Sequence, residues 1–350
     1  MRTRVFAGLS AAILALSLAA CSTNARLDAQ SAASDAGASA QSAAPSAPAK
    51  LERIQAYVPQ TMAFGAPMAG FGAEGKLAAF SDDVSVTNWD GLDELKTALM
   101  QGDVQVAATP AYVAANLYNK GVDIQFVGPV VWGMLHVVGP AEATEGDWDQ
   151  LKGAKVAVPL PGNMPDLVFR YLLKQKGISA DDLEIVPVDS AQQVMQMLVQ
   201  GQVQWAVLPE HAATVSTLKA KEAGIDLARV IDMQRTWGEV TGGDAKFPMA
   251  GLVMPGELAR SNPALVDAVR AEVAATIDKL NAEDEATLQK VADHYQLPLP
   301  VVKKVVPGLR LEMVPAAQAR KVYEDFLTRI GEESSAIYGG KLPDDGFYGN

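Results

Sequence analysis

Few side chains in this sequence could carry out chemistry, and they are widely separated. The chain has three histidines, His136, His211 and His294, and one cysteine, Cys21. Their spacing matches no metal-ligand motif, and the sequence has no His-Glu-x-x-His pattern, no Gly-x-Ser-x-Gly turn and no phosphate-binding glycine loop. The residues therefore predict a protein that is not an enzyme and uses no cofactor and no metal.

Polar side chains that could hold a ligand follow two short apolar segments. Thr109 and Tyr112 come after the first segment, and Glu210 and His211 come after the second. Each segment leads into a helix, whose first N–H groups can hold an anion or a polar group. We expect these four residues to bind a ligand. Glu210 could equally match the helix dipole, and His211 could be a surface or capping residue.

Amide and aromatic side chains elsewhere complete the predicted ligand site. Asn163 opens a helix with Asp166 three residues later, so it either caps that helix or contacts the ligand. Arg170 and Arg235 are the cations expected nearest the site, with exposed salt bridges as the alternative role. The other predicted contacts are rings that could wall a pocket: Phe64, Trp89, Trp132 and Trp237.

The two apolar segments belong to an internal repeat with a spacing of 99 residues. Residues 98–115 read ALMQGDVQVAATPAYVAA, and residues 197–214 read MLVQGQVQWAVLPEHAAT. Both contain, in order, the end of an amphipathic helix, a glycine stop, an apolar strand, a proline and a new helix. Such a unit presents a strand-to-helix turn at the carboxyl edge of a parallel sheet. Two copies indicate two lobes of like build around a shared crevice, with chance similarity in an alanine-rich chain as the alternative.

Strand and helix patterns alternate along the chain, which predicts an α/β fold with two lobes, each a central sheet of parallel strands flanked by helices. Residues 123–138 form a long extended run that we expect to cross between the lobes. A second extended run, residues 229–240, is expected to carry the chain back. The predicted organisation is a first lobe over residues 51–134 and 240–350, with a second lobe, residues 135–239, inserted into it.

The first fifty residues differ in composition from the rest. Arg2 and Arg4 precede an apolar run that ends just before Cys21, which is the pattern of a secretory signal over residues 1–20. The run resembles the lipobox of bacterial lipoproteins, which implies that Cys21 is acylated and anchors the protein to a membrane. Residues 21–50, rich in Ala and Ser, predict a disordered tether. We therefore expect a lipid-anchored protein in the periplasm or on the outer face of the cell membrane.

Composition limits the partners. The formal net charge of −12 excludes nucleic acid, because binding a polyanion needs basic patches. A chain of 350 residues with 49% hydrophobic and 20% charged residues suits two globular lobes. We expect a monomer whose ligand is a small-molecule solute.

Several stretches resemble a known family of bacterial proteins. They are LKGAKVAVP at residues 151–159, the segment from Pro165 to Leu173, VLPE at 207–210, NLYNKG at 116–121 and GKLPDD at 340–345. These stretches resemble solute-binding proteins of ABC importers, in the nitrate/sulfonate/taurine branch related to thiamine-precursor binders. The resemblance covers residues 51–350 and implies a type II periplasmic-binding fold that closes on a solute and docks on an ABC permease and ATPase. It departs at His211, where that branch often has proline.

The leading hypothesis from these features is a membrane-tethered receptor that delivers a small organic solute to an ABC importer. A ligand-sensing or envelope lipoprotein without transport is the second hypothesis, and an enzyme that shares the fold is the third. The thiamine-pyrimidine synthases of this fold carry a cysteine-rich motif, which a chain with one cysteine lacks.

Overall fold

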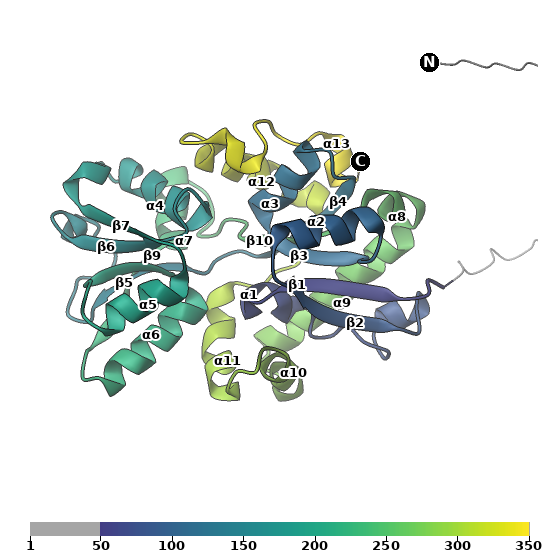
Figure 1. The fold of residues 1–350 in the computed structure, drawn as a ribbon, viewed down its shortest axis with the longest axis horizontal. Coiled ribbons are helices and arrows are strands. Elements are labelled where there is room, and N and C mark those ends of the chain that lie inside the picture. Colours follow the sequence, from purple (N-terminus) through teal and green to yellow (C-terminus); the bar gives the residue numbers. More distant parts are fainter. Residues whose placement is uncertain (1–49, 350) are drawn as a thin grey trace, which may run out of the picture. The chain divides into compact units, whose positions relative to one another are not determined.

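Two five-stranded sheets, one in each of two lobes, organise the computed structural model, which describes residues 50–349 (Figure 1). Both sheets are flanked by helices and belong to a single unit, Pro48–Asn350. This architecture confirms the predicted fold class. The predicted signal over residues 1–20, Cys21 and the tether as far as residue 49 lie outside the described residues.

The first sheet has the strand order β2-β1-β3-β10-β4. Its strands are β1 (Ile54–Pro59), β2 (Val84–Trp89), β3 (Val106–Pro110), β4 (Ile124–Val131) and β10 (Ala250–Pro255). Helices α2 (Leu92–Gln101) and α3 (Ala111–Asn119) lie on one face, and α1 (Met62–Gly65) lies on the other (Figure 1).

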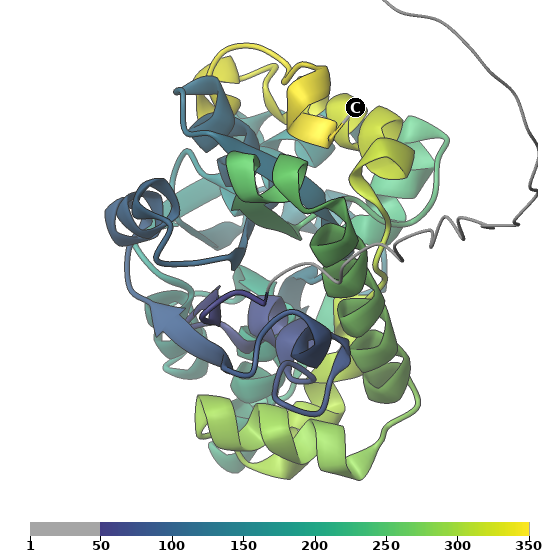
Figure 2. The same cartoon turned by 90° about the vertical axis from the view of Figure 1, so that its right-hand side faces the viewer.

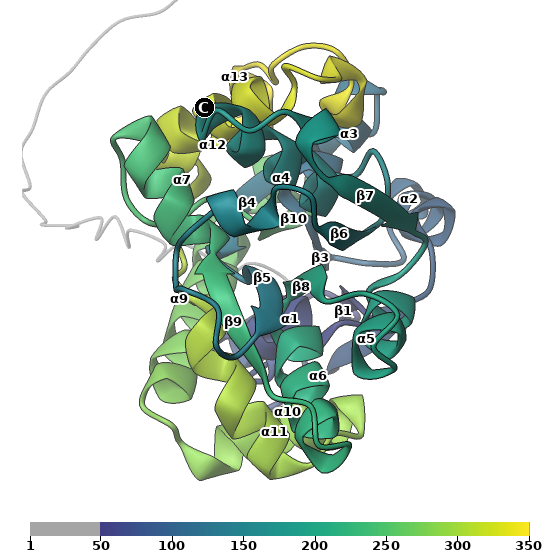
Figure 3. The same cartoon turned by 90° about the vertical axis from the view of Figure 1, so that its left-hand side faces the viewer.

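The second sheet has the order β7-β6-β8-β5-β9. Its strands are β5 (Leu135–Pro140), β6 (Lys155–Pro159), β7 (Glu184–Val188), β8 (Trp205–Pro209) and β9 (Leu227–Asp232). Figure 3 shows α4 (Met164–Gln175) and α7 (Met233–Thr241) on one face and α5 (Ala191–Val199) and α6 (Glu210–Glu222) on the other.

The internal repeat corresponds to equivalent elements of the two lobes. Its copies form α2-β3-α3 in the first lobe and α5-β8-α6 in the second, and β3 and β8 are the central strands of their sheets. In each copy the glycine after the helix, Gly102 or Gly201, has a left-handed backbone with φ of 75° or 68°, which ends the helix. The two sheet orders also make β1 equivalent to β6. The repeat therefore reflects two lobes of like build.

The strands that begin at the crossings run against their neighbours. Strand β10 is antiparallel to β3 and β4, and β5 is antiparallel to β8 and β9, so the prediction of parallel pairing holds only for the other strand pairs. The physical reason is the path of the chain. The parallel strands point their carboxyl ends at the other lobe, whereas a strand that begins where the chain has just crossed must run away from it.

The first crossing lies where the sequence predicts it, and the second does not. The extended run of residues 123–138 forms β4 and β5, joined by Trp132–Met134. The run of residues 229–240 was predicted to be extended, but only its start is β9 and the rest is α7. Asp232 caps that helix by accepting from the N–H groups of Gln234 and Arg235, and the chain returns through residues 243–249.

The C-terminal part of the chain adds helices around both lobes. They are α8 (Gly256–Ser261), α9 (Pro263–Asn281), α10 (Glu285–Tyr295), α11 (Leu299–Val305), α12 (Ala316–Ile330) and α13 (Asp345–Tyr348). Figure 2 shows the long α9, in green, leading down to α10 and α11. Helix α11, which the sequence reading missed because Pro298 and Pro300 flank its start, packs against α6 and so links the first lobe to the second.

Short 3₁₀ segments connect these elements. They are η1 (Ala66–Met68), η2 (Lys76–Ala79), η3 (Asp149–Leu151), η4 (Ala180–Asp182), η5 (Val306–Leu309) and η6 (Ser335–Tyr338). Just after η5, Arg310 forms an ion pair with Asp232 of the second lobe and donates to the carbonyl of Ala245 in the returning segment. The two lobes are therefore held together beside the crossings by charge as well as by packing.

Candidate functional site

Both strand-to-helix turns of the repeat lie at the junction of the lobes, where Tyr112 contacts Asn163 and His211 shares a cavity with Thr61. Helix α3 begins after Pro110 and helix α6 after Pro209, at the carboxyl ends of β3 and β8. The first N–H group of each helix is already used. The amide of Ala111 donates to Met249 O at 3.0 Å, and that of Glu210 donates to Met134 O at 2.6 Å. These two amides hold the crossing segments in place rather than standing open for an anion.

The next residue of each helix, Tyr112 in α3 and His211 in α6, occupies the same position in the repeat. Tyr112 reaches the second lobe, where its hydroxyl donates to Asn163 Oδ1 at 3.1 Å. Burial raises the pKa of Tyr112 to about 12, so the hydroxyl keeps its proton and remains a donor. The structure thus brings together two residues predicted for the site from positions 51 residues apart.

Asn163 does not cap α4 with its side chain, contrary to the capping reading of the sequence. It stands at the N-cap position, but no backbone N–H of the helix donates to it. Asp166 makes no return bond to Asn163 either; its carboxylate accepts from the Gly162 amide at 2.8 Å and from Arg170 Nε at 2.7 Å. The Asn163 side chain instead accepts from Tyr112 and donates to Pro161 O at 3.4 Å.

His211 lines a cavity of about 320 Å³ between the lobes. The cavity is closed on the first-lobe side by the β1–α1 turn and by α10 and α11, and on the other side by α6. Thr61 Oγ1 and His211 Nδ1 are covered by protein atoms and have no hydrogen-bond partner, while both residues line the cavity. Burial lowers the pKa of the His211 imidazole to about 4, although the neighbouring Glu210 carboxylate raises it. The residues that line the cavity are Gln60, Thr61, Met62, His211, Val215, Tyr295, Leu297 and Val301.

Glu210, predicted as a ligand contact or a dipole partner, is engaged inside the second lobe. Its carboxylate lies 2.8 Å from His136 Nε2 and accepts from Arg229 Nε at 2.9 Å and from Thr214 Oγ1 at 2.8 Å. Burial raises the pKa of the Glu210 carboxyl, but the contacts with His136 and Arg229 outweigh it and leave the pKa below its usual value. On its outer side the backbone of Gly308 passes so close that a Cβ there would lie 2.6 Å from the carboxyl carbon.

Thr109 lies at the carboxyl end of β3 and is fully buried, and its hydroxyl has no hydrogen-bond partner. Such an unsatisfied polar atom costs stability unless something supplies a partner. Thr109, like Thr61 and His211, therefore has an unpaired polar atom in the part of its lobe that lies toward the junction.

The predicted aromatic wall is buried within the protein. Trp89 Nε1 donates to Ala108 O, and Trp132 Nε1 donates to Glu312 O while Lys246 Nζ lies over its ring. Trp237 packs on three other rings, those of Tyr171, Phe247 and Phe326. Phe64 is buried in α1, directly after the turn that lines the cavity. A role of these rings in ligand binding stays a prediction.

The cations expected near the site are paired elsewhere. Arg170 contacts Asp166, and Arg235 forms an exposed ion pair with Glu145. Across residues 50–349, every arginine has a carboxylate partner within 4.0 Å. Apart from His211, the inter-lobe cavity is lined by no Asp, Glu, Lys or Arg side chain.

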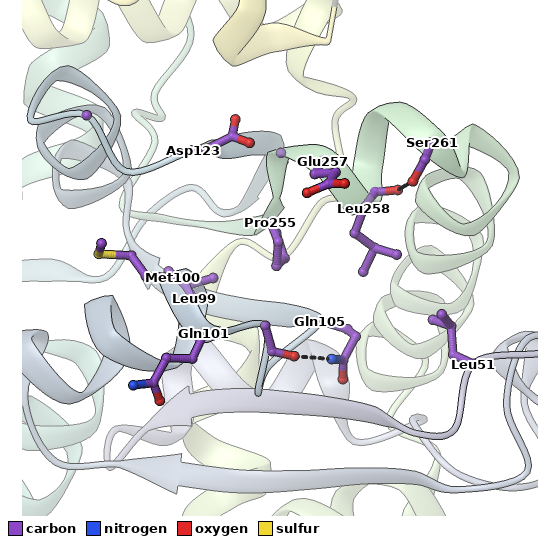
Figure 4. A pocket seen from close by; sticks show the side chains of 13 residues that line it. Leu51, Leu99, Met100, Gln101, Gln105, Asp123, Pro255, Glu257, Leu258 and Ser261 are labelled. Carbon is purple, nitrogen blue, oxygen red and sulfur yellow. Dashed lines mark hydrogen bonds between the residues drawn. The ribbon is translucent and has the colours of Figure 1, made fainter. Parts of the chain in front are cut away.

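A larger pocket, of about 590 Å³, lies at the opposite edge of the first sheet (Figure 4). Gln105, which precedes β3, and Asp123, which precedes β4, are on its wall, together with Glu257 of α8. The strand-to-helix turns point away from this edge, and Asp123 is paired with Arg260. We therefore place the candidate site in the smaller, inter-lobe cavity.

Within residues 50–349, no three His, Cys, Asp or Glu side chains are grouped closely enough to hold a metal ion. Over the same range, no helix combines the length and the apolar character needed to cross a membrane.

The sequence reading missed the first-lobe wall of the cavity. Gln60, Thr61 and Met62 lie in the turn after β1, and Tyr295 and Leu297 come from the end of α10 and the connection to α11. A signal for Thr61 was available, because it precedes α1 as Asn163 precedes α4 at the equivalent strand of the other lobe. The α10–α11 contribution depends on tertiary packing and carries no local pattern.

Comparison with solved structures defines the class of the fold, which is that of two-lobed periplasmic binding proteins. An ABC transporter protein from Parabacteroides distasonis matches with a TM-score of 0.69 and 23% identity over 85% of this chain and 98% of its own. The periplasmic aliphatic sulphonate binding protein SsuA from Escherichia coli matches with a TM-score of 0.62 and 16% identity over 84% and 93%. The periplasmic nitrate-binding protein NrtA from Synechocystis PCC 6803 matches with a TM-score of 0.54 and 15% identity, over 72% of this chain and 69% of its own.

The chain belongs to the NMT1-like family, whose family model matches residues 89–293. Family and fold together confirm the resemblance to the nitrate/sulfonate/taurine branch of solute-binding proteins. A comparison with curated protein sequences gives no match.

Proposed function

We propose that this protein is a solute receptor that captures a small organic molecule between its two lobes and delivers it to an ABC permease and its ATPase. The observation that carries the proposal is the inter-lobe cavity at the carboxyl ends of β1 and β8, whose wall combines apolar side chains with the polar residues Thr61 and His211. Concave sites of about 300 Å³ or more, largely apolar and with a few polar groups, are typical of small-molecule binding.

The connection between the lobes supports capture by closure. Within residues 50–349, two segments cross between the sheets, at Trp132–Met134 and at residues 243–249, so the lobes can rotate about them as nearly rigid bodies. The solved structures of the same fold are described as an ABC transporter protein and as binding proteins for sulphonate and nitrate. Their descriptions support a receptor rather than an enzyme.

The receptor works beside a membrane, on its outer side. Cys21, acylated after removal of residues 1–20, is the proposed anchor, and residues 21–50 are the proposed tether. The first lobe comprises residues 51–134 and 240–350, the second comprises residues 135–239, and the receptor acts as a monomer.

Native mass spectrometry of the protein, purified from its own host without denaturation, tests the capture step by giving the mass of a retained solute. Uptake of that solute into vesicles containing an ABC permease and ATPase from the same host tests delivery. We expect uptake that depends on the added receptor. Retention of no molecule together with uptake that ignores the receptor would contradict the proposal.

A further inference from the structure

Gly308, in η5 of the first lobe, lies directly against the Glu210 carboxylate of the second lobe. A Cβ built on Gly308 would lie 2.6 Å from the carboxyl carbon of Glu210, 2.7 Å from its Cγ and 2.8 Å from its Oε2. Real Cβ atoms essentially never come within 3.0 Å of another heavy atom. Glycine at position 308 therefore lets the two lobes approach each other as closely as they do in this structure.

The Glu210 side chain is held in place and does not readily move aside. Its carboxylate accepts from Arg229 Nε at 2.9 Å and from Thr214 Oγ1 at 2.8 Å, and it lies 2.8 Å from His136 Nε2. The residue is buried. Moving the carboxylate away from these partners would leave buried charges unpaired, which is strongly destabilising. The network thus makes Glu210 a rigid surface against which Gly308 rests.

Gly308 is attached to the first lobe. The η5 segment packs against α9 and α11 of that lobe, and Leu309, the next residue, is fully buried. Farther along, the N–H of Val314 donates to Pro129 O of β4 at 3.2 Å. A rotation of the second lobe about the crossings therefore changes the separation between Gly308 and Glu210.

The contact lies beside the first crossing. Arg310, two residues after Gly308, accepts at its carbonyl from the N–H of Trp132 at 3.3 Å. On the other side, the N–H of Glu210 donates to Met134 O at 2.6 Å. Both sides of the contact are thus bonded to the same connection between β4 and β5. Because rotation about a hinge moves distant points farther than near ones, a wedge placed here separates the far sides of two rigid lobes by more than its own thickness.

We propose that Gly308 and Glu210 form the stop at which the two lobes close, so that the residue type at position 308 sets how far they close and how tightly they hold a solute. This inference rests on the proposed capture by closure and adds a positioning residue to it. Neither residue is among those that line the inter-lobe cavity. They act through the separation of α6 from α10 and α11, which close the cavity from its two sides.

Distances between the lobes test the stop directly. Spin labels are attached to Lys96→Cys on α2 and Gln196→Cys on α5, both exposed positions, in the Cys21→Ala protein so that no other cysteine reacts. Figure 3 shows both helices on the right, opposite the connection between β4 and β5, so an opening of the lobes separates the labels. Double electron–electron resonance gives the label distance in the protein as purified from its host.

Gly308→Ala should lengthen that distance by more than the step from 2.6 to 3.4 Å that the added methyl group needs to reach ordinary contact with Glu210. Gly72→Ala, elsewhere in the first lobe, is the matched control and should leave the distance unchanged, because nothing lies within 4 Å of its built Cβ. Neither glycine has a left-handed backbone, so alanine adds only a methyl group at both positions. In the Glu210→Ala background, which removes the stop, Gly308→Ala should not change the distance further.

Native mass spectrometry measures the effect on solute binding. The share of molecules that retain the copurified solute should be about tenfold lower in Gly308→Ala than in Gly72→Ala, because the closed arrangement is less populated. Circular dichroism and thermal unfolding establish that each variant is folded.

Three results would overturn the inference: label distances that Gly308→Ala leaves unchanged, a lengthening that persists in the Glu210→Ala background, or a retained solute whose share is equal in the two glycine variants. The outcome is separable from that of the receptor proposal. Receptor-dependent uptake with unchanged label distances removes the stop and keeps the receptor function. Lengthened distances in a protein that retains no solute and supports no uptake do the reverse.

Discussion

The hydroxyl of Tyr112 donates to Asn163 Oδ1 at 3.1 Å. This bond joins the start of α3 in the first lobe to the start of α4 in the second, between residues 51 positions apart in the sequence. It shows that the turns of the two lobes meet directly on one side of their junction. On the other side the equivalent residues, His211 and Thr61, face a cavity.

A double-mutant cycle of Tyr112→Phe and Asn163→Ala measures this contact. We expect a coupling free energy of about 1 kcal/mol in urea unfolding, because each change removes the same hydrogen bond. Tyr57→Phe, a tyrosine of β1, combined with Asn163→Ala, is the control pair and should give no coupling. Additive effects of Tyr112→Phe and Asn163→Ala would mean that the lobes do not meet here in solution.

Glu210→Gln should destabilise the protein by about 3 kcal/mol at pH 7, because it removes the negative charge from a buried group whose partners Arg229 and His136 remain. Its pKa is lowered from 4.5 in the folded protein, so its contribution is complete above that value and is lost as the pH falls through the lower folded value. Glu184→Gln, which breaks an exposed ion pair with Lys155, should cost less than about 1 kcal/mol. Equal losses from the two variants would refute the buried network.

His211 should make the protein less stable as the pH falls from about 6.5 to about 4. Its folded pKa of about 4 lies below the value of 6.5 for the unfolded chain, so in this window the unfolded state binds the additional proton. The loss is on the order of 3 kcal/mol and levels off below the folded pKa. Urea unfolding at several pH values should show this slope in the wild type and a flatter curve in His211→Gln. The same slope in both proteins would place the titration on another group.

Cys21→Ala should leave the folded lobes intact and move the protein from the membrane to the soluble fraction, because stable anchoring depends on its acyl chains. Cell fractionation followed by immunoblotting measures the distribution, with Ser22→Ala as the neighbouring control that stays in the membrane. Full retention of Cys21→Ala protein in the membrane pellet would exclude this anchor.

Local patterns in the sequence predict much of the fold for a physical reason. A glycine stop, an apolar strand and a proline are read from neighbouring residues, so the repeat at residues 98–115 and 197–214 revealed the two lobes and the positions of Tyr112 and His211. The antiparallel direction of β5 and β10 could not be predicted from local patterns, because it depends on where the chain crosses between the lobes rather than on side-chain types. Helix α7 was missed although Asp232 and Gly242 mark its ends.

The candidate site was predictable only in part. The sequence pointed to His211 and Tyr112 but not to Thr61 or Tyr295, which reach the cavity from β1 and α10 through tertiary packing. Glu210 illustrates the limit most clearly. Its residue type and its position after β8 suggest a ligand acceptor. Its carboxylate is instead paired with Arg229 of the next strand, β9, and the residues at positions 209–211 give no indication of that pairing.

The most direct test is a crystal structure of the protein carrying the solute that copurifies from its host. We expect electron density for one organic molecule in the inter-lobe cavity, in contact with Thr61, His211 and Val215. A solute bound instead in the pocket beside Gln105 and Glu257, or a small anion held between the lobes, would contradict it.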